Sequence, residues 1–266
     1  MLKFSANIEM LSPPVGFYDR FGIAKKSGFD CIEFWSWEGK DISRISSLCT
    51  EHELSISSIS GDGKEYSLCD DRHRKHYLDY ARASLEVAKT LGSACIVIHS
   101  NALDAHGRVV DAYEDVPVVR LYMNMARTLV ELAPFAEKAG ITCVLEPLNV
   151  LFDHKGNLLH TIEGAAEVVE AVASPYIQVL YDMYHMQIEV GNLISVFEKY
   201  HKLIGHIHVA DNPGRHEPGT GEINYKRVFQ YLEAMDYTGA VAFELSPKDT
   251  YEKAVQSIMQ LRTFSS

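Results

Sequence analysis

Four short apolar segments of the sequence end in side chains that bind metals or transfer protons. Glu146 ends the run TCVLE, Asp182 ends IQVLYD, His208 lies near the end of IGHIHV, and Glu244 ends AVAFE. Two glutamates, an aspartate and a histidine form a nitrogen and oxygen ligand set that suits a divalent cation such as Mn²⁺, Mg²⁺, Co²⁺ or Zn²⁺. The set contains no cysteine, which argues against a structural zinc site.

A second histidine precedes His208 by two residues. Side chains two residues apart on a strand point to the same side, so His206 and His208 share a face. His208 lies nearer the end of the segment, where the metal is expected. We therefore expect His206 one layer deeper, either supporting the ligand or filling the core.

Other apolar runs also end in polar or aromatic residues. Glu33 lies in CIEFW, His99 in ACIVIHS, and Trp35 and Trp37 follow Glu33. We expect Glu33 and His99 either to contact a substrate or to make structural hydrogen bonds. Trp35 and Trp37 either cover the mouth of the site or, in the case of Trp37, contact the substrate.

The elements that must position these residues alternate along the chain. Eight apolar runs, each typical of a buried strand, are separated by segments with helical periodicity. Eight such units in roughly 250 residues are typical of an α/β protein with a (β/α)8 barrel, also called a TIM barrel. In that fold the carboxyl ends of all strands meet at one rim, where the site lies. A doubly wound open sheet is the alternative, but no G-x-G-x-x-G follows the first run.

The helical segments have regular apolar stripes and glycine stops. Two clear examples are residues 70–91 and 119–138. Four segments end in a glycine that leads into the next run, in SGFD, LGSA, AGIT and TGAV, and such a glycine is a common helix stop. No linker interrupts the pattern, so we expect residues 1–266 to form a single domain.

Composition narrows the class of protein. The 266 residues have a net charge of −11, with 36 acidic and 25 basic side chains, which disfavours binding to nucleic acid. No apolar run reaches the roughly 20 residues of a membrane helix, so no membrane interaction is expected. The five cysteines are scattered, which fits a reduced, cytoplasmic environment.

The motifs LEPLN, YDMYHMQ, IGHIHVADNPGRHEPGTGEINY and FELSP resemble the hydroxypyruvate isomerase family. That family lies within the xylose-isomerase-like TIM barrels, beside ketose 3-epimerases and inosose dehydratases. The similarity runs along the whole chain and is strongest from residue 141. Some hydroxypyruvate isomerases have glutamine at the position of His208, whereas the ketose epimerases have histidine.

The resemblance implies a divalent metal held by Glu146, Asp182, His208 and Glu244. It implies that Glu146 and Glu244 form the catalytic acid and base, and that His185 and Arg215 contact substrate oxygens. The implied reaction removes a proton beside a carbonyl group and returns it through an enediolate.

Three interpretations follow for the activity. The first is an aldose–ketose type isomerase of a small keto-acid or ketose, of the hydroxypyruvate and tartronate-semialdehyde type. The second is a ketose 3-epimerase, and the third is a lyase of the inosose dehydratase type. An endonuclease on the same barrel is disfavoured by the net charge. Relatives commonly pair, and the stretch YDMYHMQI at 181–188 offers apolar side chains, so a homo-oligomer is expected.

Overall fold

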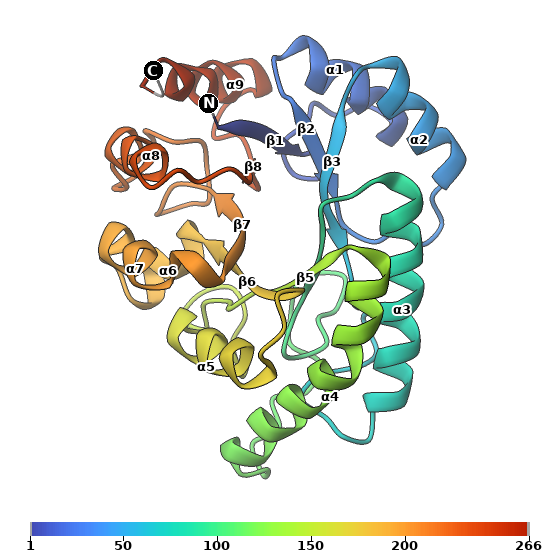
Figure 1. Cartoon of the computed structure of the whole chain (residues 1–266). Coiled ribbons are helices and arrows are strands. Elements are labelled where there is room, and N and C mark those ends of the chain that lie inside the picture. The colour runs from blue at the N-terminus through green and yellow to red at the C-terminus, as the bar shows by residue number, and fades with distance from the viewer. Residues whose placement is uncertain (1, 265–266) are drawn as a thin grey trace.

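The computed structural model describes residues 2–264 and has eight parallel strands in that range, which close into a barrel in the order β1 to β8 (Figure 1). The strands are β1 (Lys3–Asn7), β2 (Cys31–Phe34), β3 (Ser55–Ser60), β4 (Cys95–Ile98), β5 (Thr142–Leu145), β6 (Ile177–Asp182), β7 (Ile204–Val209) and β8 (Ala240–Phe243). The predicted TIM barrel is therefore confirmed. Each predicted apolar run contains one of these strands.

Helices follow the strands and surround the barrel (Figure 1). They are α1 (Arg20–Lys26), α2 (Ile42–Glu51), α3 (Arg74–Leu91), α4 (Val118–Ala139), α5 (Ile162–Val172), α6 (Met183–Glu189), α7 (Leu193–Tyr200), α8 (Tyr225–Ala234) and α9 (Tyr251–Gln260). Three 3₁₀ segments, η1 (Phe17–Asp19), η2 (His201–Leu203) and η3 (Leu261–Phe264), complete the order. No helix within residues 2–264 is long and apolar enough to cross a bilayer.

The two long predicted helices have the expected boundaries to within a few residues. Both α3 and α4 end at a glycine in the left-handed conformation, Gly92 at φ +65° and Gly140 at φ +71°. The same prediction is wrong for α8, which ends at Ala234, well before Gly239. There the left-handed position is taken by Asp236 at φ +53° instead of by a glycine.

Alternation along the strands decides which side chains face the barrel axis. In β6, Val179 and Tyr181 pack against the main core around the barrel. Leu180 belongs instead to a separate buried cluster with Cys95, Val97 and Val144. Because successive side chains point to opposite faces, this small cluster fills the barrel interior.

The same alternation places the predicted ligand positions. Residues 143, 145, 207, 209, 241 and 243 all pack on the helix-facing side. The residues between or directly after them, Glu146, His208 and Glu244, therefore face the barrel axis. Asp182 is two residues after Leu180 and faces the same way.

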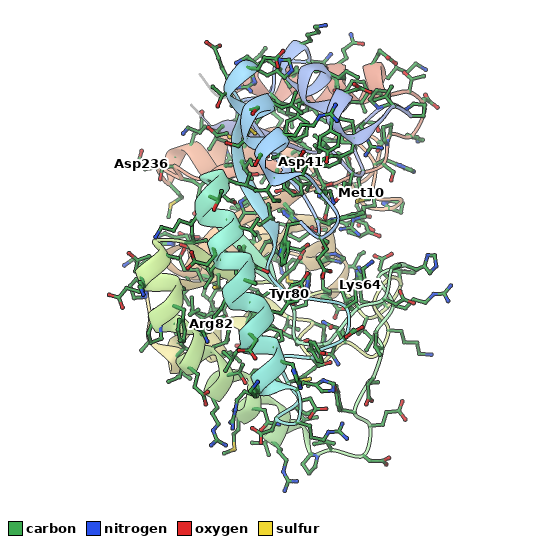
Figure 2. The ribbon with its side chains drawn as sticks, turned by 90° about the vertical axis from the view of Figure 1, so that its right-hand side faces the viewer. Met10, Asp41, Lys64, Tyr80, Arg82 and Asp236 are labelled. Carbon is green, nitrogen blue, oxygen red and sulfur yellow. The ribbon has the colours of Figure 1, made fainter. Side chains whose placement is uncertain are left out.

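The two ends of the barrel are distinct in a side view. Met10 and Lys64, in the segments after β1 and β3, lie on one side of the molecule, and Asp236, in the segment before β8, lies on the other (Figure 2). The segments that follow the strands thus form one rim. The candidate site is built at this rim.

Candidate active site

Four side chains from consecutive strands meet at the carboxyl rim of the barrel. Glu146 follows β5, Asp182 ends β6, His208 lies in β7 and Glu244 follows β8. Each offers one oxygen or nitrogen atom, and these atoms all lie within 4.8 Å of one another. All four residues are buried. The fold thus brings the predicted ligand set together.

The imidazole of His208 lies among the three carboxylates. Its Nδ1 atom is 3.4 Å from Oε2 of Glu244, 3.7 Å from Oε1 of Glu146 and 4.0 Å from Oδ2 of Asp182. None of these contacts has hydrogen-bond geometry, and Nδ1 has no partner in the described part of the chain. Oε1 of Glu146 is likewise buried and unpartnered. Four ligand atoms therefore surround a common point without bonding to one another.

The charge of the cluster is poorly balanced by the protein. The pKa of Asp182 is raised above its usual value. Burial is the largest cause, and the nearby carboxylates of Glu146 and Glu244 raise the pKa further, whereas the Arg215 guanidinium lowers it. Burial alone would lower the pKa of His208, but Glu33 and Glu244 hold it well above its usual value. Crowded carboxylates and orphaned ligand atoms are the features that a divalent cation would satisfy, so the residues fit such an ion.

A second buried layer lies beneath His208. Oε2 of Glu33 accepts hydrogen bonds from Oγ of Ser58 at 2.8 Å and from Nε2 of His206 at 3.0 Å. Oε1 of Glu33 lies 3.3 Å from Nε2 of His208, without hydrogen-bond geometry. His206 occupies the deeper layer that the sequence predicted. Glu33 is 1% exposed and lies between His206 and His208, in contact with both.

Glu146 is held by a histidine and aspartate pair. Nε2 of His99 is 3.2 Å from Oε2 of Glu146, and Nδ1 of His99 is 3.2 Å from Oδ1 of Asp62. Burial lowers the pKa of His99, but Asp62 and Glu146 raise it to about 10. The sequence prediction missed Asp62, although this residue lies two positions after the end of β3 and the strand-end criterion would have found it.

Three side chains donate hydrogen bonds to the carboxylate of Glu244. Oε1 accepts hydrogen bonds from Nε1 of Trp35 at 2.8 Å and Nδ2 of Asn7 at 3.1 Å, and Oε2 pairs with Nη2 of Arg215 at 2.5 Å. Trp35 thus reaches the ligand set directly. Trp37 donates its Nε1–H to Ser84 of α3, and its contact with a substrate stays a prediction. Asn7 and Trp35 were not predicted as partners of Glu244.

His185 lies beside the ligand set at the start of α6. It is fully buried, its Nε2 is 3.6 Å from Oδ2 of Asp182, and that nitrogen has no hydrogen-bond partner in residues 2–264. Asp182 also caps α6, because its Oδ1 accepts the N–H groups of Tyr184 and His185. This cap fixes the helix that carries His185.

A tight loop after β7 positions Arg215. The carboxylate of Asp211 is fully buried and accepts four backbone N–H groups, those of Asn212, Gly219, Gly221 and Ile223, at 2.8–3.0 Å. This explains why the buried strand β7 is followed by a charged segment. The carboxylate of Asp211 organises the turn, and the guanidinium of Arg215 reaches Glu244. Arg215 itself has φ +55°.

The apolar stretch 181–188 is not a surface feature. Tyr181, Met183, Tyr184 and Met186 are all buried within the chain, the last at 0% exposure. The expectation that these side chains form an apolar surface is wrong, because α6 follows β6 directly and packs inward. The homo-oligomer remains a prediction without this support.

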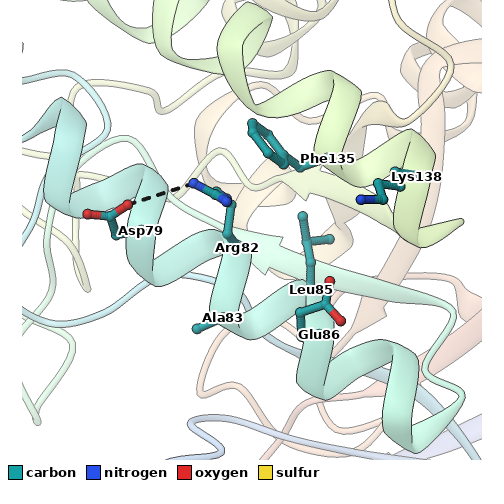
Figure 3. A pocket seen from close by; sticks show the side chains of 7 residues that line it. All are labelled: Asp79, Arg82, Ala83, Leu85, Glu86, Phe135 and Lys138. Atoms are coloured by element: carbon teal, nitrogen blue, oxygen red, sulfur yellow. Dashed lines mark ion pairs between the residues drawn. The ribbon is translucent and has the colours of Figure 1, made fainter.

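A groove of about 410 Å³ lies elsewhere, on the outer helices α3 and α4 (Figure 3). Arg82 packs over the ring of Phe135 at 4.2 Å and pairs with Asp79 at 3.9 Å. Since the groove lies outside the barrel and its arginine is paired, it contributes nothing to the rim site.

Comparison with known proteins gives a consistent result. A family model described as "Xylose isomerase-like TIM barrel" matches residues 21–261. The hydroxypyruvate isomerase of Escherichia coli K12 is 30% identical over 265 residues, covering 96% of this chain and 98% of that protein. A 2-oxo-tetronate isomerase of Haemophilus influenzae is 31% identical over 257 residues, covering 93% and 95%. The structure of a 3-keto-D-glucoside 4-epimerase from E. coli has a TM-score of 0.84 at 25% identity, covering 99% of this chain and 100% of that one.

Proposed function

Because the chain belongs to the xylose isomerase-like TIM barrel family and is an enzyme of the sugar isomerase and epimerase kind, we propose that it is a metal-dependent isomerase of a small keto-acid or ketose. The resemblance predicted from the motifs is confirmed at the level of the family. The proposed reaction is of the hydroxypyruvate and tartronate-semialdehyde type. The convergence of Glu146, Asp182, His208 and Glu244 on one buried point carries this proposal.

These four side chains would hold the divalent cation. When bound, such an ion polarises the carbonyl group and stabilises negative charge on the substrate oxygens. Glu33 would orient His208 from below, because its carboxylate lies beside Nε2 and leaves Nδ1 facing the ligand point. The contacts around Nδ1 support this assignment.

Glu146 and Glu244 would transfer the proton. They come from β5 and β8 and approach Nδ1 of His208 at 3.7 and 3.4 Å. One carboxylate removes the proton from the hydroxyl-bearing carbon beside the carbonyl, and the electron pair forms an enediolate. The second carboxylate takes the proton of the hydroxyl group and passes it to the former carbonyl carbon, and the first returns its proton to the former carbonyl oxygen, which exchanges the positions of the carbonyl and hydroxyl groups.

The two glutamates have different surroundings. Glu146 contacts His99, whose charge is balanced by Asp62. Glu244 contacts Trp35, Asn7 and Arg215. In this proposal Arg215 moves from Glu244 to a substrate oxygen, and His185 donates its free Nε2–H to another.

A 3-epimerase is the second candidate. It is supported by His208, since histidine at this position resembles the ketose epimerases. The similarity to a 3-keto-D-glucoside 4-epimerase supports epimerisation as a reaction, without favouring the third carbon. In that reaction the proton returns to the opposite face of the same carbon. An inosose-dehydratase-type lyase would use the same base but expel a hydroxyl group.

Incubation in deuterated water with Mn²⁺ tests the proposal. We would supply hydroxypyruvate, 2-oxo-tetronate and D-tagatose in separate reactions. Carbon-bound deuterium is expected in the product, and product identity distinguishes isomerase, epimerase and lyase. If no substrate incorporates deuterium in the presence of metal, the proton-transfer proposal is wrong.

A further inference from the structure

A histidine outside the predicted site lies in the segment between β5 and α5. His154 is 8% exposed, and its ring nitrogen Nδ1 lies 2.7 Å from the carbonyl oxygen of Gly107. Its backbone N–H donates to the carbonyl of Asn149 at 3.0 Å. Gly107 has φ +74°, and a Cβ there would lie 3.3 Å from Cε1 of His154. The position of the His154 ring is thus fixed by its own segment and by the segment between β4 and α4, which contains Gly107.

The hydrogen bonds of His154 define its tautomer. A carbonyl oxygen accepts only, so Nδ1 of His154 carries the hydrogen. Burial lowers the pKa of His154, the hydrogen bond to Gly107 opposes this, and Arg215 lowers the pKa further, so the net shift favours the neutral ring. Nε2 therefore has a lone pair, and this buried atom has no hydrogen-bond partner among the described residues.

His185 has the opposite tautomer. Oδ1 of Asn149 accepts the N–H groups of Phe152 and Asp153, which leaves its Nδ2 as the donor toward Nδ1 of His185 at 2.7 Å. The backbone N–H of Asn149 approaches the same nitrogen at 3.3 Å. Nδ1 of His185 is therefore an acceptor, and the hydrogen sits on its unpartnered Nε2.

We propose that His154 is a specificity-determining residue that accepts a hydrogen bond from a substrate hydroxyl group beyond the reacting pair of carbons. The inference rests on the proposed function. The rings of His154 and His185 are 5.2 Å apart between centroids, and His185 is the one beside Asp182. His185 therefore lies between Asp182 and His154, and His154 is the more distant of the two histidines from the four candidate metal ligands.

The pairing of one donor and one acceptor selects the substrate class. A hydroxyl group both donates and accepts, so it can satisfy the lone pair of His154 and the Nε2–H of His185. A carboxylate accepts only and leaves His154 unpaired. Within the proposed class the pair thus favours a hydroxylated keto-acid or ketose with more than three carbons over hydroxypyruvate, which has no hydroxyl group beyond its reacting pair.

Two substitutions separate this role from a structural one. His154→Asn keeps an N–H donor near the position of Nδ1, toward Gly107, and removes the distal acceptor. His154→Gln keeps an acceptor near the position of Nε2 and gives up the bond to Gly107. His106→Asn, at an exposed histidine next to Gly107, is the matched control.

Isothermal titration calorimetry with Mn²⁺ present would measure the binding of hydroxypyruvate, 2-oxo-tetronate and D-tagatose. His154→Asn should bind the two longer ligands roughly tenfold more weakly, the value of one lost hydrogen bond. Its affinity for hydroxypyruvate should stay within about threefold of the wild type. His154→Gln and His106→Asn should stay within about threefold for all three ligands.

Several results would overturn the inference. These are wild-type affinity in His154→Asn, an equal loss for all three ligands, a loss in His154→Gln as large as in His154→Asn, or a wild-type protein that binds neither longer ligand. Deuterium exchange keeps the two proposals separate. If calorimetry gives the expected pattern of affinities but no substrate gains carbon-bound deuterium, the proton-transfer proposal is refuted and the role of His154 in binding is retained.

Discussion

The Asp211 carboxylate gives a sharp test of how the loop after β7 is built. Each of its two oxygens accepts two backbone N–H groups: Oδ1 those of Asn212 and Ile223, and Oδ2 those of Gly219 and Gly221. Asp211→Asn replaces one oxygen by an NH₂ group. Rotating the amide gives no relief, because either orientation points the NH₂ group at two donors. Two hydrogen bonds to a charged acceptor are therefore lost.

The magnitude follows from this count. A hydrogen bond to a charged group contributes about 1.5–3 kcal/mol, so two lost bonds give about 3–6 kcal/mol. Gly219 and Gly221 lie at the surface, where water replaces part of the loss, so we expect about 3 kcal/mol. A Tm decrease of at least about 6 °C follows for a protein of this size. Thermal unfolding followed by circular dichroism measures it.

A matched control is available in Asp104. Its Oδ1 alone accepts the N–H groups of His106 and Arg108, at 2.7 and 2.9 Å. In Asp104→Asn the amide oxygen can keep both bonds, so Tm should fall by less than about 2 °C. Equal Tm values for the two variants would refute the reasoning. Asp211→Asn should also weaken substrate binding while Mn²⁺ affinity stays within about threefold, because the loop holds Arg215.

The remaining predictions concern the reaction and the assembly. Glu146→Gln and Glu244→Gln should fold and bind Mn²⁺ but lose on the order of 10²–10⁴-fold in turnover, non-additively; near-normal turnover in a metal-loaded variant would contradict the two-glutamate mechanism. Arg215→Ala should leave metal binding intact and raise KM, more for a keto-acid than for a neutral ketose, and an equal loss would favour the epimerase. Removal of metal by a chelator should abolish deuterium incorporation and lower Tm, and added Mn²⁺ should restore both; activity without metal would oppose the assignment. Light scattering at micromolar concentration should show a homo-oligomer, and a monomer would refute that expectation.

The meeting of the four candidate ligand side chains at one point was predictable because two simple rules coincide. Strand periodicity points Glu146, Asp182, His208 and Glu244 toward the barrel axis, and barrel closure brings the strand ends to one rim. Neither rule depends on loop conformation. The strand positions and the convergence of these side chains could therefore be predicted from the sequence.

Residues whose position depends on a loop path were not predictable in the same way. Trp35 follows the last residue of β2, where alternation stops, so the sequence did not indicate that it, and not Trp37, would contact Glu244. His154 is placed by Gly107, which is 47 residues away in the sequence. Such long-range loop contacts leave no periodic signal.

The pairing of the first and last strands constrains when the site can form during synthesis. β1 pairs with β8 in the register Lys3↔Ala240, and Asn7 donates to Glu244 across 237 residues of sequence. During synthesis β1 is made long before β8. The edge of β1 that pairs with β8 in the finished barrel therefore stays unpaired while the other strands assemble. Closing so distant a contact is slow, and open strand edges favour aggregation. The last strand therefore closes the barrel and brings Glu244 to Glu146 in one step, and chains released before residue 244 would lack both features.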